Sequence, residues 1–224
     1  MPSPPDSRRP LASRSSAWAP PIARALARTG ATPNQVSVAS IAFAGAGAAL
    51  LVDGTPLALV GAAVMVQLRL LCNLLDGMIA VEGGKATPTG ALYNEVPDRI
   101  ADSILLVALG YAAGHPWLGW AASLAAALTA YIRTLGGVLG HPQDFRGPMA
   151  KPHRMAVLTL ACLAGAAEVA LNATTWTLVV AAAVIASGSV VTCATRLRAI
   201  ARRLAPSYDP SPPRPSATEW RGLR

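Results

Sequence analysis

Long apolar stretches constrain the fold of this chain more than any other feature of its sequence. Six such stretches follow one another between residues 33 and 194, and about 20 apolar residues in a helix cross the hydrocarbon core of a bilayer. Of the 224 residues, 53% are hydrophobic and only 13% are charged, whereas a soluble domain carries about 25% charged residues. Because backbone groups in lipid must be satisfied within the segment, the sequence predicts an all-α integral membrane protein with six transmembrane helices.

Short polar connections separate the predicted spans. Thr32 suits the N-cap position of the first span, and Pro33 suits its first helical turn. Since six crossings are an even number, we expect both termini on the same side of the membrane. The spans are predicted at residues 33–52, 57–81, 88–114, 117–139, 155–171 and 175–194.

The two ends of the chain differ from the spans in composition. Residues 1–17 and residues 206–224 are rich in Pro and Ser, and such segments bury too little apolar surface to fold. We therefore expect both ends to be disordered. One membrane domain remains, over residues 18–205.

A short amphipathic segment precedes the first span. Residues 18–29 place apolar side chains such as Ile22 on one side of a helix, with Arg24 and Arg28 on the other. A basic amphipathic helix beside membrane spans is typical of a helix that lies in the membrane interface. The sequence therefore predicts an N-terminal interfacial helix.

The distribution of basic residues predicts the orientation of the spans. The net charge is +8 and there are 19 Lys and Arg residues, none of which falls in residues 52–57, 112–118 or 168–175. If these three connections face away from the cytosol, the positive-inside rule holds at every loop and both termini are cytosolic. The Ala-rich composition, with more Arg than Lys, favours a bacterial inner membrane. Nucleic-acid binding is disfavoured, because no aromatic platform lies among the basic residues.

Polar residues cluster where the second and third predicted spans meet. Asn73 and Asp76 share one helix face, and Asn94 and Asp98 share another. A carboxylate facing lipid costs roughly 2.5–3.5 kcal/mol, so these groups are expected to face a metal, a counter-charge or a cavity. The two helix ends meet across residues 82–89, and we expect an oxygen-rich pocket that suits Mg²⁺ with phosphate oxygens.

The spacing of these residues resembles the signature of the CDP-alcohol phosphatidyltransferase family, D-x2-D-G-x2-A-R-x8-G-x3-D-x3-D. The chain follows that spacing without a gap, and the identical positions are Asp76, Gly77, Ala80, Gly90 and Asp98. It departs from the pattern at three positions, because Asn73 and Asn94 replace Asp and Val81 replaces Arg. The resemblance covers roughly residues 18–200 and implies a variant branch of the family.

The resemblance implies a function and a role for each matching residue. The enzyme would transfer a phosphatidyl or phosphoalcohol group from a CDP-linked donor, CDP-diacylglycerol, to an alcohol or alcohol phosphate in phospholipid synthesis, releasing CMP. Asp98 would be the general base, and a homodimer would be consistent with the family. The residues that would hold Mg²⁺ or Mn²⁺ are Asn73, Asp76, Asn94 and Asp98. The residues that would shape the cytidine site are Gly77, Ala80 and Gly90.

Basic residues follow the fourth predicted span and precede the fifth. The resemblance implies an anion pocket there for phosphorylated substrates, formed by Arg133, Arg146, Lys151 and Arg154. Ordinary positive-inside flanking is an alternative explanation that the sequence leaves open.

Further charged residues lie within or beside the predicted pocket. Arg69 lies one helical turn from Asn73, and we expect it to neutralise the acidic pocket or to contact a phosphate. Arg99 is expected to pair with Glu95 at the i, i+4 spacing. Asp102 lies one turn beyond the signature, and either Glu95 or Asp102 could compensate for the missing carboxylates.

Two other functions compete with a transferase. Intramembrane carboxylates also line transporters and ion pathways, but here they lie at span ends and no inverted repeat is visible. A non-catalytic relative is the second alternative, because two of the four acidic positions are amides. The acceptor alcohol stays open among glycerol phosphate, inositol phosphate, inositol, serine and other polyols.

Overall fold

The computed structural model describes residues 19–30, 32–82, 84 and 87–205, and these residues form helices and connections without a strand. The helices are α1 (Ala19–Arg28), α2 (Pro33–Asp53), α3 (Pro56–Glu82), α4 (Gly90–Ala112), α5 (Pro116–Val138), α6 (Lys151–Asn172) and α7 (Trp176–Leu204). The tails expected to be disordered, residues 1–17 and 206–224, lie outside the described residues.

Most of the predicted spans are confirmed as helices that could cross a bilayer. Among the described residues, α2, α3, α5, α6 and α7 are long and apolar enough to do so. Helix α4 has 23 residues but carries Glu95, Asp98, Arg99 and Asp102. The all-helical architecture is therefore confirmed, with five candidate membrane spans among the described residues and a sixth helix of matching length.

The start of α2 is the one the sequence predicts. The Thr32 hydroxyl accepts a hydrogen bond from the Gln35 amide at 3.3 Å, and the Gln35 side chain accepts one from the Thr32 amide at 3.0 Å. Pro33 occupies the first turn of the helix. This capping box satisfies two amides that would otherwise lack partners at the helix end.

Helix α6 begins earlier than the sequence predicts. Its first residue is Lys151, four positions before the expected start at Met155. Pro152 lies in the first turn, where its fixed φ favours helix and its missing amide proton costs nothing. As a result, Lys151 and Arg154 belong to the first turn of a helix and not to the preceding loop.

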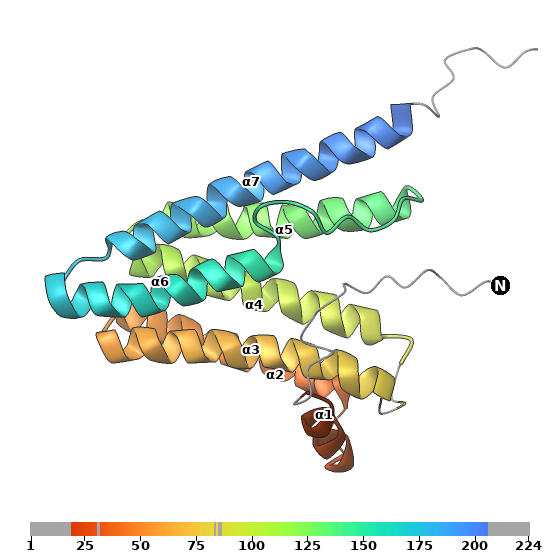
Figure 1. Ribbon diagram of the computed structural model, residues 1–224, viewed down its shortest axis with the longest axis horizontal. Coiled ribbons are helices and arrows are strands. Elements are labelled where there is room, and N and C mark those ends of the chain that lie inside the picture. The colour runs from red at the N-terminus through yellow and green to blue at the C-terminus, as the bar shows by residue number, and fades with distance from the viewer. Residues whose placement is uncertain (1–18, 31, 83, 85–86, 206–224) are drawn as a thin grey trace, which may run out of the picture.

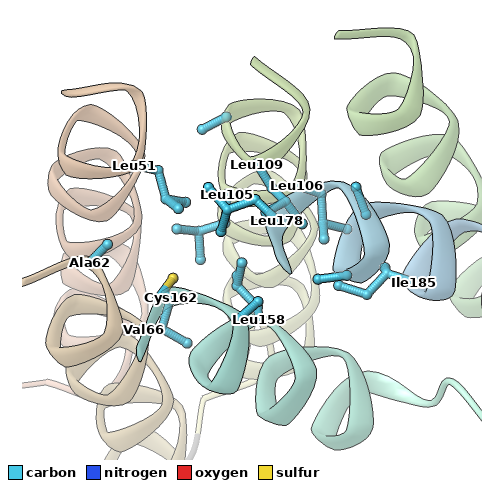
Figure 2. Close-up of a cluster of buried hydrophobic side chains, with 14 of the residues drawn as sticks. Leu51, Ala62, Val66, Leu105, Leu106, Leu109, Leu158, Cys162, Leu178 and Ile185 are labelled. Atoms are coloured by element: carbon cyan, nitrogen blue, oxygen red, sulfur yellow. The ribbon is translucent and has the colours of Figure 1, made fainter. Parts of the chain in front are cut away.

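The six long helices pack into one bundle. Figure 1 shows α4 in the middle of the bundle, in contact with α2 on one side and α5 on the other, while α6 packs against α3 and α7. Figure 2 shows the centre of the bundle, where Val66, Leu105, Leu158 and Ile185 gather from four helices. In lipid, such packing is stabilised by close van der Waals contact, because acyl chains are as apolar as leucine.

Helix α1 is anchored to the end of α3 that carries the polar residues. Figure 1 shows α1 running across the direction of the bundle near the C-terminal end of α3. Ala23 is only 1% exposed and packs with Leu75, Met78 and Ile79 of α3. The N-terminal helix is therefore fixed beside the segment that holds Asp76.

Helices α4 and α5 approach until their backbones touch. A Cβ atom on Gly119 would lie 2.8 Å from the Leu106 carbonyl oxygen and 2.9 Å from the Gly110 Cα atom. Such distances leave no room for a methyl group, so both glycines are needed for the contact.

We expect Gly119→Ala to lower stability by about 1–3 kcal/mol, because the helices must separate to admit the methyl group. Thermal unfolding in detergent would measure the change. The matched control is Gly45→Ala in α2, where an added Cβ meets nothing within 4 Å and loss of a helical glycine stabilises by up to about 1 kcal/mol. Equal melting temperatures for the two variants would contradict the expectation.

Candidate active site

The polar faces of α3 and α4 meet where the sequence predicts a pocket. Asn73 Nδ2 on α3 donates a hydrogen bond of 2.5 Å to Asp98 Oδ1 on α4. Asp76 lies one turn further along α3 and within electrostatic range of Asp98. The expected convergence of the two helices is therefore confirmed for these three residues.

Asp98 is held by four donors from three helices. Its Oδ1 accepts from Asn73 and from Arg69 Nη2 at 2.9 Å. Its Oδ2 accepts from Arg99 Nη2 at 3.2 Å and from Lys151 Nζ. The carboxylate is only 6% exposed, and three cations surround it.

A second buried aspartate extends this network away from the signature. Asp102 Oδ1 pairs with Arg69 Nη2 at 2.5 Å, and Asp102 Oδ2 pairs with Arg154 Nη2 at 3.1 Å. Arg154 also donates to the Met149 carbonyl oxygen at 2.9 Å and to the Thr129 hydroxyl at 3.4 Å. Both guanidiniums are at most 1% exposed. Arg69 thus neutralises the acidic pocket, as predicted, and Asp102 is committed to two arginines.

Asp76 differs from the other two aspartates in its partners. It is 3% exposed, and its Oδ2 accepts a 2.5 Å hydrogen bond from Ser37 Oγ on α2. Its Oδ1 is buried and has no hydrogen-bond partner. An unpaired buried carboxylate oxygen is costly, and coordination to a cation would satisfy it. Ser37 was not predicted as a site residue. Its polar side chain within an apolar span was the signal that could have suggested it.

The donor set around Asp76 is poor in carboxylates. In the described parts of the chain, no three His, Cys, Asp or Glu side chains form a group that could hold a metal ion. The reason is that Asn73 and Asn94 occupy two of the four signature positions. Asn94 is exposed in the first turns of α4, so the fit for a divalent ion rests on Asp76 Oδ1 with amide oxygens.

The expected pairing of Arg99 with Glu95 is wrong. Arg99 turns to its neighbour Asp98, and Glu95 Oε1 instead accepts from Arg133 Nη2 of α5 at 2.5 Å. Helix α4 packs against α5, which brings a cation to Glu95 that a local helix pattern does not reveal. Glu95 thus joins the helix of the signature to the basic residues beyond α5.

Arg133 is the centre of a small basic cluster. Its Nη1 donates to Gln143 Oε1 at 2.9 Å, and its guanidinium lies 5.4 Å from the centroid of the Phe145 ring. Arg154 and Arg133 both lie within electrostatic range of Arg196 on α7. Arg196 is not among the residues predicted for the anion pocket, because it lies in the last helix, far along the sequence from Arg133 and Arg154.

Arg146 is the most exposed of the predicted anion-binding residues. It forms a 2.8 Å ion pair with Asp144, and 67% of its side chain is exposed. The hydrogen bond from Arg146 lowers the pKa of the Asp144 carboxyl below its usual value. Arg146 is therefore free of the buried network that holds Lys151 and Arg154.

The last part of the connection from α5 to α6 is tied to α7. The Arg196 Nε donates to the Arg146 carbonyl oxygen at 2.9 Å, and the Met149 amide donates to the Thr192 hydroxyl at 3.0 Å. Gly147 has a φ of +127°, and a Cβ there would lie 2.4 Å from Thr192. Only glycine permits this approach.

The remaining predicted residues lie near these helix ends. Gly77 and Ala80 are half-buried on α3, and Gly90 is the first residue of α4. The structure thus joins Asn73, Asp98, Lys151 and Arg154 in one network through Arg69 and Asp102. Arg133 lies outside this network and pairs with Glu95, which lies on the same helix as Asp98.

We expect Asp102→Asn to lower stability by about 3–5 kcal/mol, because the amide leaves two buried guanidiniums without a counter-charge. Thermal unfolding of the detergent-solubilised protein would measure this loss. Asp144→Asn removes the partner of an exposed arginine and is expected to shift the melting temperature far less. A similar shift in melting temperature for both variants would show that the ion pairs of Asp102 are not important for stability.

Comparison with known proteins gives no matching family model, but it gives clear relatives. The chain is 32% identical over 196 residues to the phosphatidylinositol phosphate synthase of Mycolicibacterium smegmatis, a match that covers 80% of this chain and 82% of that protein. It is 38% identical over 149 residues to the bifunctional IPC transferase and DIPP synthase of Rubrobacter xylanophilus. That match covers 64% of this chain but only 34% of the bifunctional protein.

Solved structures of a phosphatidylinositol phosphate synthase from Mycobacterium tuberculosis share the fold. The crystal structure with CDP-DAG bound superposes with a TM-score of 0.69 at 27% identity, covering 83% of this chain and 94% of that one. The crystal structure in complex with manganese and citrate gives a TM-score of 0.68 at 26% identity, covering 81% and 88%.

Proposed function

The chain belongs to the CDP-alcohol phosphatidyltransferase family, and we propose that it transfers a phosphatidyl group from CDP-diacylglycerol to a phosphorylated polyol, releasing CMP. The observation that carries the proposal is the contact between Asn73 and Asp98. It joins the two halves of the signature across α3 and α4. The donor is supported by the neighbouring structure that holds CDP-DAG.

A divalent cation would bind at Asp76. Its buried, unpaired Oδ1 is the carboxylate oxygen that lacks a donor in this cluster, and the amide oxygens of Asn73 and Asn94 can complete an oxygen ligand set with substrate phosphates. When bound, the ion would neutralise the pyrophosphate and the charge that develops on departing CMP. Mg²⁺ and Mn²⁺ both suit these ligands, and the neighbouring structure in complex with manganese supports a divalent ion.

Asp98 is the proposed general base. The acceptor oxygen attacks the phosphorus that carries the diacylglycerol, the bond to the CMP oxygen breaks, and the hydroxyl proton passes to Asp98. Arg69 is fully buried and fixes Oδ1, whereas the side chains of Arg99 and Lys151 on Oδ2 are 26% and 23% exposed. Oδ2 is therefore the oxygen that can exchange a donor for the acceptor hydroxyl.

The acceptor is proposed to carry a phosphate, as inositol phosphate does. The relatives are named as synthases of phosphatidylinositol phosphate, whose formation from CDP-diacylglycerol needs a phosphorylated inositol. Arg133 lies within electrostatic range of Arg196, and neither arginine pairs with Asp98 or Asp102 in the described residues. Arg146 stands beside them, and the planar fork of arginine matches phosphate geometry.

We also propose the membrane arrangement that the sequence predicts. Helix α4 would be the sixth span, because its charged residues Asp98 and Asp102 are buried and paired inside the bundle. Helix α1 would lie in the cytosolic interface of a bacterial inner membrane, with both termini and the site on the cytosolic side. Residues 18–205 would form the single membrane domain, and it could form a homodimer.

The proposal predicts cation-dependent release of CMP. Purified protein would be incubated with CDP-diacylglycerol and, in turn, inositol phosphate, inositol, glycerol phosphate or serine, with Mg²⁺, Mn²⁺ or a chelator. We expect CMP and a lipid product only with a phosphorylated polyol and a cation. Asp98→Ala should lower the rate at least about 10²-fold, because the proton loses its acceptor. Normal turnover in folded Asp98→Ala protein would refute the mechanism.

The acceptor pocket predicts a selective effect of Arg133→Gln. Loss of a charge-assisted hydrogen bond costs about 1.5–3 kcal/mol, so KM for the phosphorylated acceptor should rise at least about tenfold. KM for CDP-diacylglycerol should stay within about threefold. Steady-state kinetics with each substrate varied would test this. Arg198→Gln, at an exposed position on α7, is the control. An equal rise in KM for the acceptor in both variants would show that Arg133 does not bind the acceptor phosphate.

A further inference from the structure

Lys151 occupies one side of the Asp98 carboxylate. Its Nζ contacts Asp98 Oδ2, while Arg69 and Asn73 occupy Oδ1. The Lys151 side chain is 23% exposed, so the contact is largely withdrawn from water. Asp98 therefore already has a protein cation where a metal ion could otherwise sit.

The position of Lys151 in α6 is unfavourable for the helix itself. It is the first residue of α6, and no side chain caps that helix end. The N-terminus of a helix carries a partial positive charge, and a cation there costs typically 0.3–1 kcal/mol. The ammonium thus gains nothing from its own helix, and its stabilising partner is Asp98.

The charge of the site also disfavours two divalent ions. Two ions about 3.5–4 Å apart share several anionic ligands, but Asn73 and Asn94 are neutral amides. Asp98 has donors on both oxygens, whereas Asp76 Oδ1 has none. The described residues therefore offer one open carboxylate oxygen in this cluster.

We propose that the Lys151 ammonium is a built-in cation that takes the Asp98 side of the site, so that the protein binds a single divalent ion at Asp76. Lysine suits this role because its ammonium is a compact, strongly hydrated point charge on a flexible stem. That stem allows Lys151 to leave Oδ2 when the acceptor hydroxyl arrives. The role of the single ion in phosphoryl transfer rests on the proposed function.

Binding of Mn²⁺ to the full-length, tag-free protein in detergent tests the proposal without substrate. Electron paramagnetic resonance counts free Mn²⁺, and calorimetry gives the stoichiometry and Kd. We expect one equivalent for the wild type. Lys151→Gln should bind a second equivalent or bind the first at least tenfold more tightly, because the site loses one positive charge and Asp98 Oδ2 keeps only the Arg99 donor. Lys151→Arg keeps the charge and should behave as the wild type.

Arg198→Gln removes one positive charge from an exposed position of α7 and should leave the stoichiometry and Kd unchanged. Two equivalents in the wild type would overturn the proposal, as would a change below tenfold in folded Lys151→Gln. If size-exclusion chromatography shows that Lys151→Gln is misfolded, the Mn²⁺ stoichiometry of the wild type alone tests the proposal. Absence of CMP release beside the expected Mn²⁺ counts would reject the proposed function and leave this inference standing.

Discussion

The rest of this structure depends on the ion pairs that the Arg69 guanidinium forms with two aspartates. It is fully buried and pairs with both Asp98 and Asp102 through one nitrogen atom. Charges this deep in a helical bundle are tolerable only because each one is paired, since an unpaired buried charge would cost several kcal/mol. The pairing joins α3 to α4 and, through Arg154, to the start of α6. Packing of the bundle and geometry of the site are therefore set by the same contact.

The three aspartates of the site differ in their hydrogen-bond partners. Asp102 is buried and pairs with two arginines, Asp98 accepts from four donors, and Asp76 keeps one oxygen unpaired. Identical side chains thus differ in what they can still bind. A carboxylate that lacks a donor attracts a cation, and one that is held by cations positions a reacting group.

The sequence predicted the helices and the meeting of the Asn73 and Asp98 side chains well, because both follow from helical spacing. The sequence motif at the start of the first span predicts the cap at Thr32, and helix periodicity predicts the contact between Asn73 and Asp98. The partners of Glu95 were not, because Arg133 is 38 residues away and comes close only through the packing of α4 on α5. The early start of α6 was missed for a related reason, since Lys151 gains its stabilising partner from another helix.

The connection between α5 and α6 has a mechanical consequence. Gly147 is pressed against Thr192, and hydrogen bonds to α7 fix the backbone on either side of it. To move away from α7, the backbone around Gly147 would have to break both hydrogen bonds. Any rearrangement of this connection must therefore also involve α7, whose Arg196 and Thr192 hold it.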